Sequence, residues 1–481
     1  MNYEKINRLR TYVLLWALIV AASGDAWSRG STDELLAALE AARLSQGVAG
    51  VSFAVVTPDA LLRAGGVGIM DWDKPTPVTE DTVFRIGSVT KVFTASVLLQ
   101  MQQEGKLKLA DRVRQHAPGA SYTNPWEDTH PLRIEQLLEH TAGLQDLTKE
   151  EFDNNDPKPL TLDEGLALRP DSRTVRWQPG LHSSYSNSGY GLAGYVIEQV
   201  LKQRYEDAVQ SRLFGPLGMK SSGFFQDDAS RTRLATGYQP DGKTPLRYWH
   251  MIMRPFGGIH TSARGMVPFL QMLLKDGRHA DKELLSPESM RRMETPVTTL
   301  AARSGLRFGY GLGVHHYLHR GFVFLGHGGD ADGYLAHFGY NRSLGTAYFI
   351  AINRFHWPAL RALRRVIEAW ITEGASPTPP PPEVKLTEAQ LRQYTGRFEA
   401  ATSRFTHTSA ADRSGQIVRI VYSEGRLYTE TAGGARDALL AVNPQHFRRE
   451  GEPEATAAFI FGEDGKLYFQ EDENLVRTPE M

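Results

Sequence analysis

Hydrophobic and polar residues alternate in separate parts of this chain, and the alternation predicts where its strands lie. Two strand-like runs stand near the N-terminus, at 51–56 and 61–67. Three more occur much later, at 322–326, 334–340 and 346–352. Turn residues Pro58 and Asp59 separate the first two runs, which indicates a hairpin. We expect this hairpin and the late strands to form one antiparallel sheet.

Apolar residues spaced three and four apart predict helices around and between these strands. Ser31 and Glu34 form the pattern of a capping box before a helix that ends near Gly47. Helical periodicity dominates the long stretch between the strand groups, and a helix over 357–372 follows the last strand. The predicted fold is therefore α/β (α+β): an antiparallel sheet flanked by helices, with a helical region inserted between the two parts of the sheet.

A change in composition marks the end of this first domain, which we place at 31–373. Residues 374–383 include four consecutive prolines, which cannot continue a helix and indicate a stiff linker. Residues 384–481 show strand patterns and two similar acidic-Gly turns at 424–428 and 464–468, which predict a small β-rich C-terminal domain. That domain is either a lid over the active site or a packing appendage.

The first residues have the pattern of an export signal. Basic residues precede an apolar run from Tyr12 to Ala22, and a small-residue cleavage site follows at Ala26. We therefore expect residues 1–26 to be a signal peptide and the protein to be periplasmic or secreted, without a stable membrane span after cleavage. An uncleaved anchor is the alternative, but the run is shorter than the roughly 20 apolar residues that a spanning helix needs.

The composition limits which partners and which catalytic groups this chain can have. With 54 basic against 55 acidic residues among 481, the chain lacks the charge of a nucleic-acid-binding protein. It contains no cysteine, which excludes thiol nucleophiles and thiolate zinc sites. A nucleophile would therefore be an oxygen or a nitrogen. No spaced cluster of ligands predicts a metal site, and we expect no cofactor.

Ser88 and Lys91 stand three residues apart where a helix is predicted to begin. Their side chains lie on one face of that helix, and its free backbone N–H groups point past the serine. A serine hydroxyl needs a neighbour that accepts its proton, and a desolvated lysine amine can do so. This pattern alone is weak evidence, because an N-cap serine before a solvated lysine gives it too. The helix is nevertheless predicted to be buried, since apolar residues surround it: Val89, Phe93, Val97 and Met101.

Two later segments contain further residues that could lie in one site with Ser88 and Lys91. Tyr185 and Asn187 stand two positions apart before another helix, and residues so spaced in an extended segment project the same way. The strand at 322–326 continues into His327-Gly328-Gly329, where glycine lets a substrate backbone approach closely.

In these three motifs the chain resembles the serine β-lactamase and penicillin-binding-protein superfamily, in its class C-like branch of esterases and D-aminopeptidases. Residues 88–91 match the nucleophile motif, 185–187 the Tyr-x-Asn motif and 327–329 the His-x-Gly form of the third, in the family's order. Flanking segments are similar too: 140–144, 213–219 and 257–262. The resemblance covers roughly residues 49 to 355.

The resemblance implies a role for each site residue. Ser88 is the acylated nucleophile, Lys91 and Tyr185 share the duty of base, and Asn187 orients the substrate. The backbone N–H groups of Ser88 and Asp330 form the oxyanion hole. The implied activity is that of a serine hydrolase of esters, amides, D-amino-acid peptides or β-lactams, acting on a small-molecule or peptide substrate. The alternative is a penicillin-binding-type acyl acceptor or an inactive binding protein.

Two residues depart from the family pattern. His327 replaces the usual lysine, and a largely neutral imidazole holds a substrate carboxylate less firmly, which favours ester or other acyl substrates. Asp330 stands where the family commonly has a small residue. It either points away from the oxyanion hole or receives a cationic group of the substrate.

Overall fold

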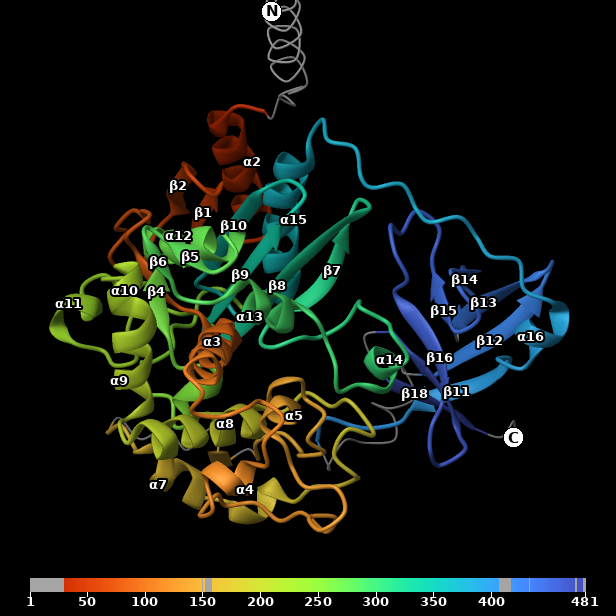
Figure 1. Cartoon of the computed structure of the whole chain (residues 1–481). Coiled ribbons are helices and arrows are strands. Elements are labelled where there is room, and N and C mark those ends of the chain that lie inside the picture. The colour runs from red at the N-terminus through yellow and green to blue at the C-terminus, as the bar shows by residue number, and fades with distance from the viewer. Residues whose placement is uncertain are drawn as a thin grey trace, which may run out of the picture.

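The structure, a computed structural model, describes residues 30–478 apart from 149, 152–157, 406–416, 432 and 472–473. The proposed signal peptide at 1–26 lies outside the described residues. Figure 1 shows two parts side by side, a larger α/β part and a blue C-terminal barrel. A long segment without helix or strand joins α15 (Trp357–Thr372) to α16 (Glu388–Arg392) and includes the predicted linker at 374–383.

The predicted antiparallel sheet is present, with strand order β2-β1-β10-β9-β8-β7. Its strands are β1 (Gly50–Val56), β2 (Leu61–Gly68), β7 (His315–His319), β8 (Phe322–Ala331), β9 (Tyr334–Asn341) and β10 (Thr346–Ile352). Two features differ from the sequence expectation. No bounds were predicted for the edge strand β7, although His315 and His316 fitted surface or edge-strand positions, and β8 extends past Gly326 through the whole third motif. The glycines of that motif hid the continuation of the strand.

Helices cover both faces of the sheet. On one face, α2 (Thr32–Ser45) packs against α15, and an apolar cluster joins both helices to the sheet. The predicted capping box of Ser31 and Glu34 begins α2, and the helix ends before Gly47, whose φ of +60° favours glycine. On the other face, α12 (Ala263–Leu274) packs against β1 and β10.

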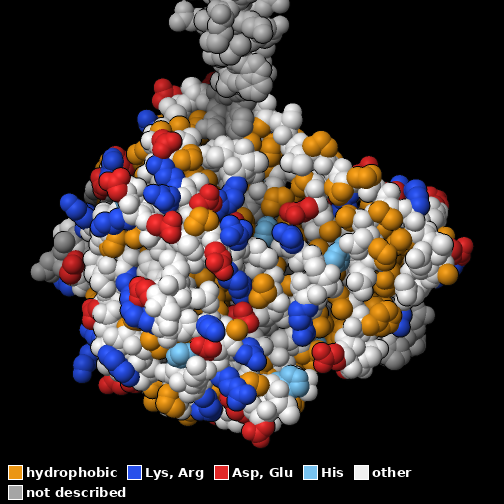
Figure 2. Space-filling model, in the orientation of Figure 1, with side chains coloured by type: hydrophobic (Ala, Val, Ile, Leu, Met, Phe, Trp, Pro, Cys, Tyr) orange, Lys and Arg blue, Asp and Glu red, His pale blue; other side chains and the backbone are white. Residues whose placement is uncertain are grey.

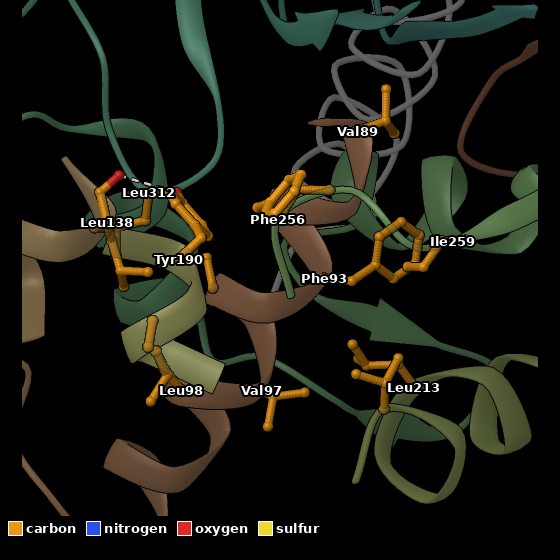
Figure 3. Packing of buried hydrophobic residues seen from close by; sticks show 14 of the residues in the cluster. Val89, Phe93, Val97, Leu98, Leu138, Tyr190, Leu213, Phe256, Ile259 and Leu312 are labelled. Carbon is orange, nitrogen blue, oxygen red and sulfur yellow. Dashed lines mark hydrogen bonds between the residues drawn. The ribbon is translucent and has the colours of Figure 1, made fainter. Parts of the chain in front are cut away.

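The inserted region is helical, as predicted, and α3 (Thr90–Gln103) runs through its middle. Apolar side chains surround α3 on all sides, so the helix that follows Ser88 is held rigidly (Figure 3). Tyr190 of α8 (Asn187–Leu201) donates a hydrogen bond of 2.9 Å to the carbonyl of Leu138, at the end of α5 (Ile134–Leu138). The shorter helices are α4 (Val113–His116), α7 (Leu162–Ala167), α9 (Tyr205–Val209), α10 (Gly215–Leu217), α11 (Asp228–Arg231), α13 (Pro287–Glu294) and α14 (Leu300–Arg303). Short strands pair outside the main sheet: β3 (Val83–Arg85) with β4 (His260–Ser262), and β5 (Arg278–His279) with β6 (Lys282–Glu283).

The predicted β-rich C-terminal domain is a closed antiparallel barrel. Its strands are β11 (Gly396–Ala400), β12 (Val418–Ser423), β13 (Arg426–Thr431), β14 (Arg436–Ala441), β15 (His446–Arg448), β16 (Ala457–Phe461), β17 (Leu467–Gln470) and β18 (Asn474–Thr478). Both acidic-Gly turns connect neighbouring strands, as expected. Aromatic rings fill the barrel's interior, among them Phe398, Phe447, Phe459 and Phe469.

The surface carries charges of both signs. Figure 2 shows basic and acidic side chains interspersed on the face in view, in keeping with the balanced charge of the sequence. Among the described residues, no helix is long and apolar enough to cross a membrane.

Candidate active site

Ser88 lies in η1 (Gly87–Val89), a single 3-10 turn that leads directly into α3. The turn packs backbone to backbone against β8. A Cβ on Gly87 would collide with the backbone of Asp330, and a Cβ on Gly329 would collide with the carbonyl of Ile86. Gly87 also has a φ of +50°, in the region that favours glycine. Glycine at both positions is therefore what allows the third motif to lie against the serine.

Lys91, one turn along from Ser88, is fully buried. Its Nζ lies 3.0 Å from Ser88 Oγ, 2.6 Å from Asn187 Oδ1 and 2.9 Å from the carbonyl oxygen of Phe256. Burial holds the pKa of Lys91 well below its usual range, and Arg404 lowers it further, whereas Asp146 and Asp330 act in the opposite direction. These surroundings favour the neutral amine of Lys91, which is the form that can accept a proton.

Tyr185 completes the contacts of the serine. Its hydroxyl donates a hydrogen bond of 2.9 Å to Ser88 Oγ, and burial raises the pKa of the phenol well above its usual value. The phenol is therefore protonated at rest. Its ring lies 4.2 Å from the ring of His140, centroid to centroid.

Asn187 also contacts Lys91, but not because it lies with Tyr185 in one extended segment, as the spacing suggested. It is the first residue of α8, with Ser186 as the N-cap, so the segment changes from extended to helical between Tyr185 and Asn187. Its side chain bridges Lys91 and Asp146, with Nδ2 donating to Asp146 Oδ2 at 3.2 Å. The carboxylate of Asp146 also accepts from the backbone N–H of Asn187 at 2.8 Å.

His327 is buried close to the ring of Tyr185. Its Nε2 forms a hydrogen bond of 2.8 Å with the hydroxyl of Tyr310. Burial holds the pKa of His327 well below its usual value, and His315 and Lys91 lower it further. The imidazole is therefore neutral at physiological pH, as we expected from its identity.

The second half of β8 has a free edge toward the serine. Strand β7 pairs with β8 only as far as Gly326, whereas β9 pairs with it through Ala331 on the other side. Gly328 and Asp330 therefore line the cavity that contains Ser88. Asp330 is exposed, and its negative charge raises the pKa of both Lys91 and Tyr185.

The cavity lies between the α/β part and the barrel and has a volume of about 970 Å³. One end of the barrel closes it, where β12 begins at Val418 and β17 ends at Gln470. Arg404, from the segment after β11, reaches beside Tyr185. Sequence analysis missed Asp146, Tyr310 and Arg404. Asp146 follows the segment 140–144, which resembled the family, but no sequence pattern distinguished Arg404.

Some charged and titratable side chains near the active site belong to the cavity and others do not. Arg254 is buried in an ion pair with Glu206 and does not line the cavity. The pair His315 and His316 belongs to the edge strand β7, but both line the cavity, and burial lowers the pKa of His315 to about 4. Within the described ranges, no group of histidine, aspartate and glutamate side chains is arranged to hold a metal ion.

Comparisons with known proteins find relatives of this chain by sequence and by fold. The chain is 31% identical over 303 residues to penicillin-binding protein 4 of Amycolatopsis lactamdurans, which covers 61% of this chain and 78% of the relative. Among solved structures, the octameric penicillin-binding protein homologue from Pyrococcus abyssi has a TM-score of 0.61 at 22% identity, covering 93% of this chain and 100% of that one. The D-amino acid amidase from Ochrobactrum anthropi has a TM-score of 0.57 at 24% identity and covers 70% and 98%.

These two structures share the fold. The sequence profile described as Beta-lactamase matches residues 31–369, which include each of the three motifs and most of the chain. The chain therefore belongs to the beta-lactamase family.

Proposed function

We propose that this protein is an exported, metal-independent serine hydrolase in which Ser88 forms the acyl-enzyme. One observation carries the proposal: Ser88 Oγ lies 3.0 Å from Lys91 Nζ and 2.9 Å from the hydroxyl of Tyr185, at the wall of a large cavity. A nucleophile, a base and a second proton-transfer group thus meet at one oxygen atom.

The contacts of Lys91 orient its amine for this role. A neutral amine has two N–H donors and one lone pair. Asn187 Oδ1 and the carbonyl of Phe256 accept the two donors, which leaves the lone pair directed toward Ser88 Oγ. Asn187 is in this way a positioning residue for the base.

In the acylation step, Ser88 Oγ bonds to the carbonyl carbon of the substrate, and the bond from that carbon to the leaving group breaks. The hydroxyl proton of Ser88 passes to Lys91, while Tyr185 gives its phenolic proton to the leaving group. The proton held on Lys91 then passes to the phenolate of Tyr185, so both groups return to their resting forms. The N–H groups of Ser88 and Asp330 hold the oxyanion. A water molecule then adds to the acyl carbon, the bond from that carbon to Ser88 Oγ breaks, and a proton of the water passes to Ser88 Oγ.

We propose neutral esters and amides as the substrate class, with preference for acyl groups that carry a free amine. The neutral His327 offers no charge to a carboxylate, and the exposed Asp330 offers a charge to an ammonium group. A similar fold occurs in a protein named as a D-amino acid amidase. Amino-acid amides and esters are the first substrates to try.

The nucleophile is tested with a fluorophosphonate probe on wild type and on Ser88→Ala. We expect wild type to be labelled and the variant to be unlabelled but folded, because only one small hydroxyl is lost. Labelling retained in the variant would contradict the assignment of Ser88. Turnover of a chromogenic ester, followed after the first burst, distinguishes a hydrolase from an acceptor that stays acylated.

The location is tested by cell fractionation. We expect the mature chain in the periplasm or the medium, cleaved after Ala26 as read by N-terminal sequencing. A full-length chain retained in the membrane fraction would instead support an uncleaved anchor.

A further inference from the structure

The C-terminal barrel contributes a charged side chain to the catalytic centre. Arg404 lies after β11, and its Nε donates a hydrogen bond of 2.6 Å to Asp146 Oδ2. The side chain of Asp146 is fully buried in the α/β part, whereas the side chain of Arg404 is 44% exposed. The guanidinium also lies 4.8 Å from the centroid of the Tyr185 ring.

The segment 401–405 is anchored to the α/β part by contacts that do not use the side chain of Arg404. Thr402 Oγ1 donates to the carbonyl of Ser183 at 3.0 Å, and Arg176 Nη1 donates to the carbonyl of Ser403 at 2.7 Å. The carbonyl of Arg404 itself accepts from the backbone N–H of Asp146 at 3.1 Å. A substitution of the Arg404 side chain therefore leaves the anchors of this segment in place.

A chain of hydrogen bonds leads from Arg404 to the base. Arg404 holds Asp146, Asp146 holds both the side chain and the backbone N–H of Asn187, and Asn187 holds Lys91. A buried carboxylate without a partner is costly, and an uncompensated negative charge near a lysine favours the protonated amine. The positive charge of Arg404 offsets the negative charge of Asp146, which is connected to Lys91 through Asn187.

We infer that Arg404 is a positioning residue for acylation, through which the barrel holds Asp146 and Asn187 in place and keeps Lys91 in the form that accepts a proton from Ser88. This inference rests on the proposed function of Ser88 and Lys91. It assigns the barrel a part in catalysis, beyond covering the cavity.

Other groups facing Lys91 bear on any pH dependence. They are Asp146, Asp330, Arg404, His140, His327, Tyr185 and Tyr190. Burial lowers the pKa of both histidines and raises that of both tyrosines, so these four stay neutral around pH 7. The balance of charge near the base is then set by Asp146 and Asp330 against Arg404.

The test measures the rate of fluorophosphonate labelling from pH 5 to pH 10 in wild type, Arg404→Ala, Arg404→Lys and the double variant Arg404→Ala with Asp146→Asn. Without Arg404, the unpaired Asp146 raises the pKa of Lys91, so the acid limb of the profile moves toward alkaline pH, by about one pH unit. On that limb the labelling rate falls about tenfold at a fixed pH. The double variant removes the carboxylate charge as well, so we expect its limb to return toward that of wild type.

Arg404→Lys keeps the charge and is expected to restore part of the rate. Arg436→Ala is the matched control, because Arg436 is a barrel arginine paired with Glu430 that does not line the cavity. Its profile is expected to match that of wild type, and thermal melting checks that each variant is folded.

An Arg404→Ala profile that superimposes on wild type would overturn the inference. So would a variant that only raises KM for anionic substrates, since this would make Arg404 a substrate-binding residue. Both outcomes differ from failure of the proposed function itself. That function fails if wild type is not labelled, or if Ser88→Ala is still labelled.

Discussion

The wall of the cavity that carries Ser88 and the wall that the barrel supplies hold their side chains in different ways. The serine wall consists of the turn η1, which leads into the buried helix α3, and of strand β8, which touches the turn backbone to backbone at two glycines. The barrel wall consists of strand ends and of a segment fixed to the α/β part by hydrogen bonds. The first arrangement leaves the reacting atoms little freedom, and the second varies more easily without loss of the fold. We therefore expect changes at the groups that contact or position Ser88 and Lys91, Arg404 included, to affect every substrate. Changes of charge at Asp330 and at position 327 are expected to affect only some substrates.

The largest effect is expected for Tyr185→Phe. This change removes a hydroxyl that contacts Ser88 Oγ and alters almost no volume. Loss of a proton-transfer group costs about 10²–10⁴-fold, so we expect kcat to fall in that range with KM little changed, for esters and amides alike. Steady-state kinetics on both substrate types is the measurement. A rate within a few-fold of wild type would show that Lys91 acts alone.

Gly329→Ala tests whether the close contact of β8 with η1 positions the oxyanion hole. The new Cβ would collide with the carbonyl of Ile86, so the strand has to move away from Ser88. We expect a loss of about 10²-fold in kcat, comparable to removal of one oxyanion donor. Gly328→Ala is the matched comparison, because its Cβ would meet the ring of Trp357 at an ordinary 3.5 Å. Equal losses in the two variants would contradict this account.

Asp330→Asn tests the proposed preference for a free amine. It keeps the shape of the side chain and removes its charge, so we expect kcat/KM for an amino-acid ester to fall about tenfold. At a pH above the acid limb, where Lys91 is the neutral amine in both proteins, the matching ester without an amine is expected to keep its rate. The readout is kcat/KM for the amino-acid ester divided by kcat/KM for the ester without an amine, measured on wild type and on Asp330→Asn. A ratio unchanged by the substitution would remove Asp330 from substrate recognition.

His327→Lys tests whether the lack of a positive charge at position 327 disfavours substrates that carry a carboxylate. A lysine at this position adds a charge that a β-lactam carboxylate can meet, but it loses the hydrogen bond to Tyr310. We expect the selectivity for penicillins over a neutral ester to rise by about 1 kcal/mol, or about fivefold, and the gain to shrink in high salt. Wild type that already hydrolyses nitrocefin faster than nitrophenyl acetate would overturn the reasoning.

The smallest effect is expected from a chelator. The proposed mechanism uses only Ser88, Lys91 and Tyr185 and backbone N–H groups, so incubation with EDTA is expected to leave ester hydrolysis unchanged. Inhibition by EDTA that added zinc reverses would contradict the mechanism.

The sequence by itself determined much of the fold and the contacts of Ser88. Periodicity of two and of 3.6 residues is a local property, so it predicted four strands at 51–56, 61–67, 334–340 and 346–352 and the helix at 357–372 close to their observed bounds. Ser88, Lys91 and Tyr185 were predicted because three short motifs, taken together and in order, resemble those of a known family, whereas the local pattern of Ser88 and Lys91 alone was weak evidence. The same reasoning failed where glycine obscured the pattern, as in the second half of β8.

Only the tertiary structure decided what surrounds that centre. Asp146 and Arg404 are 258 residues apart in the chain, and their ion pair exists because the barrel docks beside the α/β part. Tyr310 meets His327 because β7 turns back along β8. Contacts of this kind depend on how surfaces pack across long separations, and neither composition nor spacing of single residues encodes that packing. Arg404, one of several arginines beyond the linker, therefore carried no signal until the fold brought it to Tyr185.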